Sequence, residues 1–299
     1  MSNKSLGPDF IGIGAMKAAS GWIFRCIELH PEVSEATPKE LHFFSKPYNY
    51  EKGIKYYYSI FKKHPPGKIK GEYTPAYMSY KHVASRIHEH LPNVKLIACL
   101  RNPVDRAYSQ YRYNIQEGGR FKIYKNFEET IRKDKDILKR GFYFQQLKPY
   151  FKLFPKENIL ILFFEDIKKD PIKFVQKIYE FLELKDTNFI PSLVNRKSSI
   201  TGAYITQYKL PVLNFLVYWL NYRLKKDGFF RKLLIKNQFE KLFIKFQQKT
   251  RKRITGKNTE VLSIQPLKEK TREYLLNVVY GNEISKLEKL LDKDLSFWK

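Results

Sequence analysis

Three short apolar runs, each followed closely by a segment of helical character, constrain the fold of this sequence more than any other feature. They read FIGIG at residues 10–14, VKLIACL at 94–100 and NILILFF at 158–164. Nearly continuous apolar runs of this length are typical of parallel strands that are covered on both faces. Repeated strand-to-helix units indicate an α/β fold in which helices flank a central parallel sheet.

The segments after these runs predict the helices. Apolar residues recur at helical spacing from Ser20, Pro103 suits the first turn of a second helix, and residues 171–182 predict a third. Residues 267–291 predict one or two amphipathic helices. Residues 201–259 are rich in Lys, Phe, Leu and Tyr with few breakers, and they predict a helical insertion. We therefore expect a single domain over residues 1–299 that includes this insertion.

The chain carries a strong positive charge, with 56 Lys and Arg against 30 Asp and Glu and a formal net charge of +26. A field of this sign attracts nucleotides, acidic or sulfated glycans, nucleic acid or lipid headgroups. Because the basic residues are spread along the chain, charge alone does not select among these partners. Cys26 and Cys99 lie in apolar surroundings, so we expect two core thiols. No cysteine spacing suggests a metal site.

Signals for a membrane or a leader segment are weak. The first ten residues, MSNKSLGPDF, contain no apolar stretch, and no apolar run reaches the roughly 18–20 residues that span a bilayer. We therefore expect a cytoplasmic protein. Residues 210–235 combine apolar and aromatic side chains with arginines and lysines, which fits a basic amphipathic helix on a membrane surface. A helical hairpin packed on the rest of the domain or on a second copy is the alternative.

A turn of small residues follows the first apolar run. Residues 14–22 read GAMKAASGW and combine small residues, a lysine and a helix start. A phosphate-type anion needs backbone N–H groups that it can approach, the positive end of a helix and a cation. The Gly-Lys-Ser/Thr order of a Walker loop is missing. An ordinary strand-to-helix turn with a surface lysine is the alternative.

A second candidate site begins where the second apolar run ends. Arg101 stands at that end, where open α/β sheets bind ligands, and Ser109 follows two helical turns later. A guanidinium and a hydroxyl that converge suit a phosphate monoester. The alternative is a helix start held by ion pairs to Asp105. We favour the ligand for Arg101 and the ion pair for Arg106.

A third candidate site lies within KELHFF, residues 39–44, where Glu40 and His42 flank a leucine. In an extended segment alternate residues share a face, so the two side chains would point the same way. Either could accept a proton from a hydroxyl or amine. The alternative is a surface glutamate beside a histidine with a structural role.

Taken together, and in their order along the chain, residues 14–22, 39–44 and 101–109 resemble motifs of the sulfotransferase superfamily. The resemblance is strongest to its heparan sulfate N- and 3-O-sulfotransferases and their bacterial relatives. The family's first loop, K-x-G-T-T-x, is similar to residues 17–22, and its E-x-x-F-F to residues 40–44. Its E-K-[ST]-P-x-Y is similar to residues 72–77, and its R-[DN]-P-x-[DE]-R-x-x-S to residues 101–109. The resemblance covers residues 8–185 and resumes at about residue 262.

This resemblance implies a P-loop-like fold and an enzyme that uses 3′-phosphoadenosine-5′-phosphosulfate (PAPS) and no metal. A sulfuryl group would pass to a hydroxyl or amine of a saccharide-like or lipid-linked acceptor. Glu40 would remove the acceptor proton, with His42 as the reserve candidate. The 3′-phosphate of PAPS would bind Arg101 and Ser109, with Arg196 as a further contact.

The resemblance also implies that the first loop binds the 5′-phosphosulfate of PAPS. The loop consists of Lys17, Ala18, Ala19, Ser20, Gly21 and Trp22. Lys17 would neutralise the leaving oxygen and Ser20 would donate to the 5′-phosphate. Trp22 would either stack on adenine or pack against a helix. Ala19 and Gly21 depart from the pattern, because they replace a glycine and a threonine and so remove one hydroxyl donor.

Other readings stay open. Tyr73 stands where the glycan enzymes often carry a lysine near the acceptor.

A P-loop-like kinase that binds ATP is one alternative function, although the missing Gly-Lys-Ser/Thr order counts against it. A basic nucleic-acid-binding protein is another, but no helix-turn-helix or RNA-module pattern supports it, and we expect no specific nucleic-acid partner. A sulfotransferase-like protein that only binds ligands is a third.

Overall fold

The computed structural model describes residues 6–34, 39–116, 124, 126–195, 204–208 and 259–298. The chain forms two compact units. The first comprises residues 1–107, 135–199 and 269–299, and the second comprises residues 108–134 and 200–268. Most of the sequence-predicted site residues fall in the first unit.

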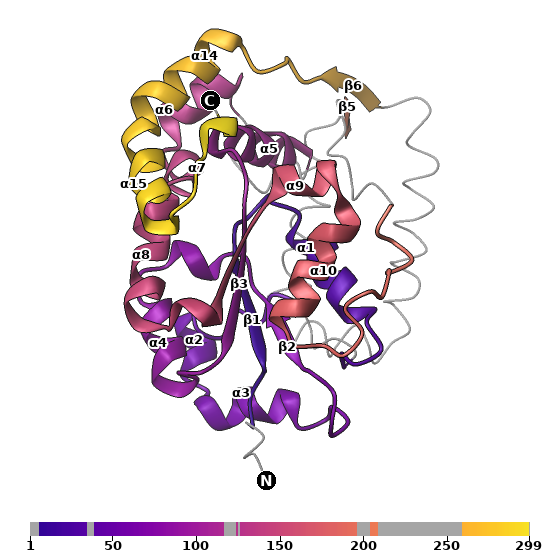
Figure 1. The fold of residues 1–299 in the computed structure, drawn as a ribbon. Coiled ribbons are helices and arrows are strands. Elements are labelled where there is room, and N and C mark those ends of the chain that lie inside the picture. The colour runs from indigo at the N-terminus through magenta and orange to yellow at the C-terminus, as the bar shows by residue number, and fades with distance from the viewer. Residues whose placement is uncertain are drawn as a thin grey trace, which may run out of the picture. The chain divides into compact units, whose positions relative to one another are not determined.

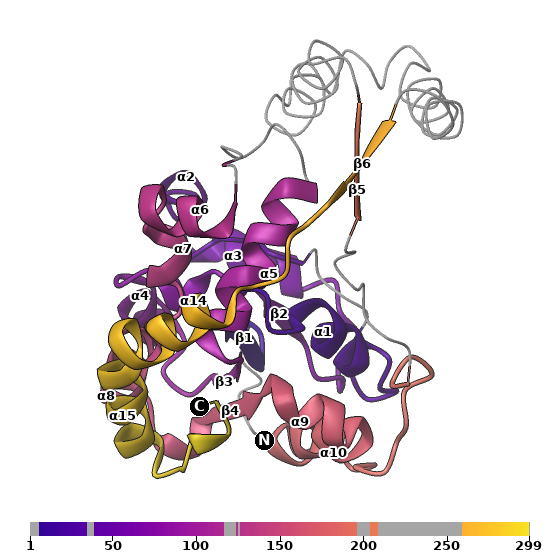
Figure 2. The ribbon, with the colours of Figure 1, turned by 90° about the horizontal axis from the view of Figure 1, so that it is seen from above.

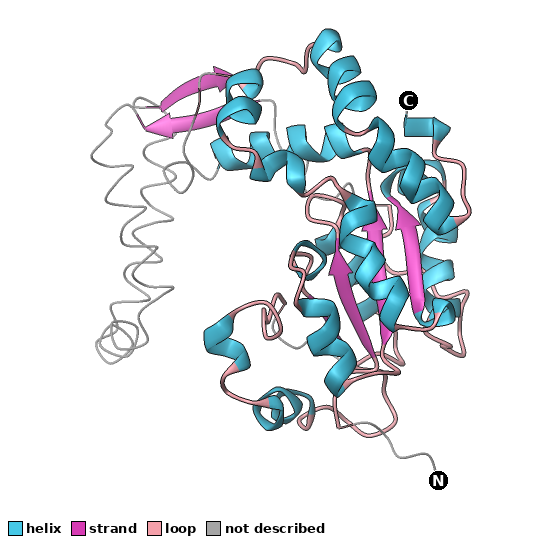
Figure 3. Cartoon of the chain, turned by 90° about the vertical axis from the view of Figure 1, so that its left-hand side faces the viewer, coloured by secondary structure: helices cyan, strands magenta, loops and turns pink. Residues whose placement is uncertain are grey.

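The first unit is built on a four-stranded parallel sheet with the order β2-β1-β3-β4 (Figure 1). The strands are β1 (Phe10–Gly14), β2 (Gly71–Tyr73), β3 (Lys95–Leu100) and β4 (Ile159–Phe163). The apolar runs thus form the three adjacent strands β1, β3 and β4, which confirms the predicted parallel α/β fold. Because the strands are parallel, their carboxyl ends meet at one edge of the sheet, where the arrowheads lie in Figure 3.

Helices cover both faces of this sheet (Figure 2). On one face lie α1 (Ser20–Glu28) and α10 (Pro171–Phe181), and on the other lie α4 (Val83–His90), α8 (Tyr143–Leu153) and α15 (Gly281–Leu291). The other helices of this unit are α2 (Pro47–Tyr50), α3 (Ile54–Phe61), η1 (Tyr77–Ser79), α7 (Asp136–Lys139), η2 (Lys156–Asn158), α9 (Phe164–Lys169), α14 (Glu269–Tyr274), η3 (Leu275–Val279) and η4 (Ser296–Trp298).

Local sequence explains where the helices begin. α10 has proline at its first position, and the Asp170 carboxylate caps it by accepting the Lys173 backbone N–H at 2.9 Å. The predicted helix over residues 171–182 is therefore confirmed to within one residue. In contrast, α1 begins without any side-chain cap, and that difference matters for the candidate site.

The end of β1 is held by a buried tyrosine. Tyr73 is completely buried, and its hydroxyl donates to the Gly14 carbonyl at 3.0 Å. Its ring lies over Gly12 so closely that a Cβ on Gly12 would come within 2.2 Å of it. Tyr73 therefore supports the strand end from inside the core instead of facing an acceptor.

The two cysteines are core residues, as the sequence predicts. Cys26 and Cys99 are both free and fully buried. Burial raises the pKa of Cys26 to about 12 and that of Cys99 well above the usual thiol range. Both thiols therefore stay protonated and unreactive at neutral pH.

The boundary between the two units falls inside α5 (Pro103–Gln116). The second unit contains α6 (Phe127–Lys133), which Asn126 caps through the Glu129 backbone N–H, and an antiparallel pair, β5 (Tyr204–Tyr208) and β6 (Thr259–Ser263). The helical prediction for residues 201–259 is therefore wrong at its ends, because the YITQY sequence of β5 is rich in aromatic and β-branched residues that favour strands. Residues 209–258, including the predicted surface helix at 210–235, lie outside the described residues.

Candidate active site

The first loop connects β1 to α1 and has an unusual backbone. Lys17 and Ala19 have φ angles of 68° and 60°, in the left-handed region that non-glycine residues enter at a cost of about 1–3 kcal/mol. No acidic residue lies in the first turn of α1, and no side chain caps it. The start of this helix therefore presents positive backbone N–H groups beside a lysine, which suits an anion.

Arg101, which follows β3, contacts this loop directly. Its Nη1 donates to the Lys17 carbonyl at 3.1 Å, and its guanidinium lies 4.4 Å from the centre of the Phe164 ring. Burial lowers the pKa of Arg101, and the Asp105 carboxylate opposes that shift. Since an arginine side chain stays charged in proteins, it brings a fixed positive charge to the loop. The first two sequence motifs therefore meet at the carboxyl edge of the sheet.

Arg106 does not form the ion pair that the sequence predicts with Asp105. Asp105 instead pairs with Arg272 at 2.5 Å, and Arg106 is fully buried and donates to the Ile137 carbonyl. The prediction is wrong because consecutive residues on a helix point in different directions and do not face each other. Arg106 therefore acts as a core anchor for the segment before α8.

Two predicted contacts of the 3′-phosphate are not tested by this geometry. Ser109 is a buried residue of α5, but it belongs to the second unit. Arg196 lies outside the described residues. Both roles stay predictions.

Trp22 packs inside the first unit. Its side chain is 7% exposed, its Nε1 donates to the Leu193 carbonyl at 3.3 Å, and its ring centre lies 5.9 Å from that of Phe174 on α10. These contacts show that Trp22 packs against a neighbouring helix, which is one of the two roles that the sequence left open. Stacking on adenine stays a prediction.

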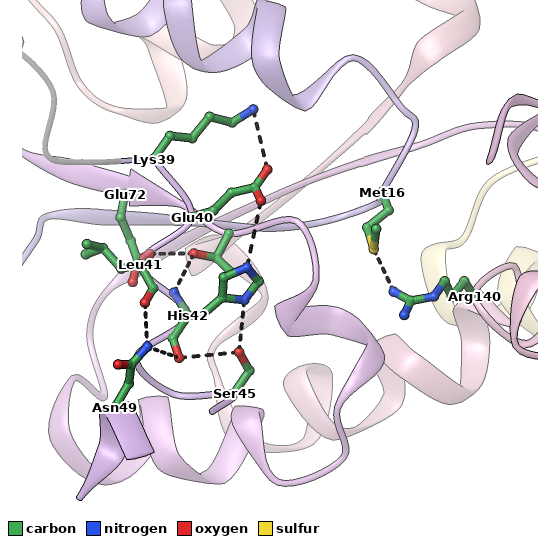
Figure 4. Close-up of polar contacts among 10 residues, drawn as sticks. Met16, Lys39, Glu40, Leu41, His42, Ser45, Asn49, Glu72 and Arg140 are labelled. Carbon is green, nitrogen blue, oxygen red and sulfur yellow. Dashed lines mark hydrogen bonds and ion pairs between the residues drawn. The ribbon is translucent and has the colours of Figure 1, made fainter. Parts of the chain in front are cut away.

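Glu40 and His42 lie together, as Figure 4 shows. Glu40 Oε2 is 3.7 Å from His42 Nε2, and His42 Nδ1 is 3.2 Å from the Ser45 hydroxyl. The predicted extended backbone is wrong, because Glu40 and His42 have φ angles of 62° and 52° in the left-handed region. The two side chains meet because the chain turns sharply here, and the Glu40 side chain remains 47% exposed. A partly exposed carboxylate beside an imidazole suits proton transfer.

A buried carboxylate supports this turn from below. Glu72 is fully buried and accepts hydrogen bonds from Tyr57, Thr74 and Tyr77 at 2.7, 2.7 and 2.9 Å. Thr74 in turn accepts the His42 backbone N–H at 3.4 Å. Burial raises the pKa of Glu72, although the three hydroxyl donors oppose the shift. The network connects the third motif to β2 and so fixes where His42 stands.

Two cations near this site were missed by the sequence analysis. The Lys39 ammonium lies 3.8 Å from Glu40 Oε1, and it is 3.3 Å from the position that a Cβ on Gly21 would occupy. The Arg140 guanidinium contacts the Met16 sulfur in the first loop (Figure 4). Lys39 could have been selected because it adjoins Glu40. No sequence pattern connects Arg140 to a loop 124 residues away.

Lys39 also connects the motifs. It lies between Gly21 at the start of α1 and Glu40, so the proposed base stands next to the helix start. A loop for an anion, a fixed arginine and a carboxylate–imidazole pair therefore share the carboxyl edge of a parallel sheet. That arrangement defines a class of protein, the α/β proteins that bind a phosphorylated ligand beyond their strand ends.

Within this class, the sulfotransferase domain model matches residues 8–201. The chain belongs to this family. The match includes the first loop, the Glu40–His42 pair and Arg101, and it confirms the superfamily that the motifs resemble.

The curated relatives agree at moderate identity. Human heparan sulfate glucosamine 3-O-sulfotransferase 6 is 30% identical over 183 residues, which make up 60% of this chain and 53% of that protein. The membrane-associated sulfotransferase kil1 of Dictyostelium discoideum is 34% identical over 137 residues, 44% of this chain and 29% of that protein. The chain thus spans about half or less of the length of these relatives.

A solved sulfotransferase from Alicyclobacillus acidocaldarius has the same fold. It superimposes with a TM-score of 0.66 at 21% identity and covers 97% of this chain and 98% of its own. The likeness supports the P-loop-like α/β fold. Within the part of the chain that the structure describes, no helix has both the length and the apolar composition to cross a bilayer.

Proposed function

We propose that this protein transfers a sulfuryl group from PAPS to a hydroxyl or amine of a saccharide-like acceptor. The observation that carries the proposal is the hydrogen bond of 3.1 Å from Arg101 to the Lys17 carbonyl. It brings two anion-binding motifs, 84 residues apart in the chain, to one place. PAPS has two phosphate groups on one adenosine, so it needs two such motifs within the span of a nucleotide.

The donor is assigned by the chemistry of these motifs. The uncapped start of α1 and Lys17 would receive the 5′-phosphosulfate, because helix N-termini and ammonium groups stabilise phosphate oxygens. Arg101 would receive the 3′-phosphate, because a guanidinium binds a phosphate through two parallel hydrogen bonds. Ser20 would add a hydroxyl donor at the 5′ end.

The transfer is an in-line displacement at sulfur. The acceptor oxygen or nitrogen forms a bond to sulfur while the bond from sulfur to the 5′-phosphate oxygen breaks. That oxygen keeps the electron pair, and Lys17 stabilises its growing negative charge. Glu40 takes the proton of the acceptor, and His42 is the alternative base. Adenosine 3′,5′-bisphosphate and the sulfated acceptor are the products.

A glycan acceptor is consistent with the substrates named for several relatives and with the positive net charge of this chain. The names of several relatives specify glucosamine of heparan sulfate as their acceptor. The net charge of +26 would draw an acidic polysaccharide toward the protein. Glu40 would take a proton from a hydroxyl or from an amine, so the proposal includes both oxygen and nitrogen as the accepting atom.

A lipid-linked saccharide at a membrane surface is the second acceptor that the sequence predicts. This prediction comes from the basic, aromatic residues 210–235, which would lie on a lipid surface and reach a lipid-linked saccharide. We expect a cytoplasmic protein with this peripheral contact. Co-sedimentation with anionic vesicles of the full chain and of a variant lacking residues 210–235 tests the membrane contact. Equal pelleting of the two proteins, or no pelleting of either, contradicts it.

Radiolabelled PAPS tests the proposed function. The purified chain is incubated with labelled PAPS and with desulfated heparan sulfate, an unsulfated glycosaminoglycan or a total lipid extract. We expect label in a polysaccharide with the wild-type chain and none with Lys17→Ala. Failure to bind adenosine 3′,5′-bisphosphate, together with no transfer to any acceptor, contradicts the proposal.

A further inference from the structure

The space beside Gly21 is occupied by a distant lysine. Gly21 is the second residue of α1 and has no side chain of its own. A Cβ added there would lie 3.3 Å from the Lys39 ammonium, the one atom within 4 Å that the described residues place there apart from the adjoining residues and the backbone of α1. The ammonium therefore stands at the start of α1, where the side chain of residue 21 would otherwise project.

Within the described residues, only a weak ion pair with Glu40 holds the Lys39 ammonium beside the start of α1. Its distance of 3.8 Å from Glu40 Oε1 is too long for a hydrogen bond. Among the described residues Glu40 is its one ion-pair partner, and both side chains are partly exposed. Exposed ion pairs of this kind contribute little to stability. An ammonium group has three donors, so this one has capacity for a ligand.

We propose that Lys39 is a second donor-binding lysine, which contacts the 5′-phosphosulfate group from the position left empty by Gly21. The inference rests on the proposed function. In the first-loop pattern described above, residue 21 would be a threonine whose hydroxyl binds the donor. Here a glycine removes that hydroxyl and makes room for an ammonium. The chain replaces a neutral donor on the loop with a charged donor from the neighbouring segment.

The position of Lys39 also connects donor binding to proton transfer. The same ammonium lies between the start of α1 and the Glu40 carboxylate. When PAPS binds, two negative groups, the sulfuryl oxygens and the Glu40 carboxylate, come close together. Lys39 lowers their mutual repulsion because it stands between them. Lys39 is thereby a catalytic residue that contacts the transferred group.

The first experiment compares ligands with and without a 5′-phosphate. Calorimetry measures binding of adenosine 3′,5′-bisphosphate and of adenosine 3′-monophosphate to the wild-type chain, Lys39→Met and Lys52→Met. Lys52 is a matched control, because it is exposed and lies over the Tyr56 ring at 4.7 Å. We expect Lys39→Met to weaken binding of the bisphosphate about 10- to 150-fold, the range for a charged hydrogen bond, and to leave binding of the monophosphate unchanged.

The outcomes separate this inference from the proposed function. If the wild-type chain binds no adenosine 3′,5′-bisphosphate, the proposed function fails. If it binds and Lys39→Met matches Lys52→Met, or weakens both ligands equally, only the role of Lys39 is overturned. Thermal melting of each variant shows whether it is folded.

A second pair of variants keeps the test valid if Lys39→Met folds poorly. Gly21→Ser in the wild-type chain puts a Cβ 3.3 Å from the ammonium and a hydroxyl beyond that Cβ, so the ammonium must shift to make room and bisphosphate binding should weaken. In the Lys39→Ala background the same serine meets no ammonium and supplies a hydroxyl, so binding should strengthen. An effect of Gly21→Ser that has the same sign in both backgrounds contradicts the inference.

Discussion

Replacing Arg101 by methionine separates its two roles, support of the first loop and binding of the 3′-phosphate. Methionine keeps most of the apolar volume but removes the guanidinium. The structure shows two contacts that are lost, the hydrogen bond of 3.1 Å to the Lys17 carbonyl and the stacking on Phe164 at 4.4 Å. A charged hydrogen bond contributes about 1.5–3 kcal/mol and such a cation–π contact about 0.5–2 kcal/mol.

The phosphate contact has a separate magnitude. Losing a charge-assisted hydrogen bond to a phosphate also costs about 1.5–3 kcal/mol, which corresponds to about 10- to 150-fold in affinity. Calorimetry with adenosine 3′,5′-bisphosphate and with adenosine 5′-monophosphate isolates this contribution. The monophosphate lacks the group that Arg101 binds, so its affinity should change only through the loop. We expect the bisphosphate to lose at least tenfold more affinity than the monophosphate.

Arg86→Met is the control for the loss of stability. Arg86 has the same pair of contacts, a hydrogen bond of 2.9 Å to the Phe44 carbonyl and stacking on Tyr50 at 4.0 Å, away from the first loop. Urea titration should give similar losses in the free energy of unfolding for both variants. Equal losses of affinity for both nucleotides in Arg101→Met would refute a 3′-phosphate contact and leave Arg101 as a support of the loop.

Further predictions concern the loop, the base and the core. Lys17→Ala should abolish sulfuryl transfer, and turnover near that of the wild-type chain would remove it from the reaction. Glu40→Gln should lower turnover about 10²- to 10⁴-fold, the range for a general base, and leave the affinity for adenosine 3′,5′-bisphosphate unchanged; a loss of affinity without a loss of turnover points to a structural glutamate. Gly12→Ala should cost at least about 1–3 kcal/mol in urea unfolding, because its Cβ would lie 2.2 Å from the buried Tyr73 ring. A variant as stable as the wild-type chain would contradict that packing. Burial raises the pKa of Glu72 in the folded chain above its value in the unfolded chain, about 4.3. Glu72 therefore contributes most to the free energy of unfolding at low pH, and this contribution declines as the pH rises from about 4.3 through the raised pKa. Glu72→Gln removes this decline, so the stability of the variant relative to the wild-type chain should increase with pH over that window; a constant difference would contradict the shift.

The sheet was predictable from the sequence because its strands are buried on both faces. Residues 10–14, 94–100 and 158–164 are almost entirely apolar, with Lys95 and Asn158 as the polar exceptions, and they form β1, β3 and β4 with bounds that differ by at most one residue at each end. The edge strand β2 was not predicted as a strand, since Gly71–Tyr73 is too short to have a periodic pattern. The strand β5 was misassigned because five residues inside a Lys- and Phe-rich stretch do not reveal a pairing partner that follows 51 to 59 residues later, from Tyr208 with Thr259 to Tyr204 with Ser263.

The site was predictable only in part. Lys17, Glu40 and Arg101 belong to motifs that specify local chemistry, and the structure brings Arg101 to Lys17 and His42 to Glu40. The left-handed turn at Glu40 was not visible, because neither glycine nor asparagine marks it. Arg140 was missed because its contact with Met16 depends on how α7 packs against the loop, which is a property of the fold.

The central claim is that Lys17 and Arg101 bind opposite ends of one bisphosphorylated adenosine. A crystal structure of the chain with adenosine 3′,5′-bisphosphate tests it most directly. The account predicts the 5′-phosphate on the backbone N–H groups at the start of α1 and the 3′-phosphate on the Arg101 guanidinium. A nucleotide bound elsewhere, or with its 3′-phosphate directed away from Arg101, would contradict it.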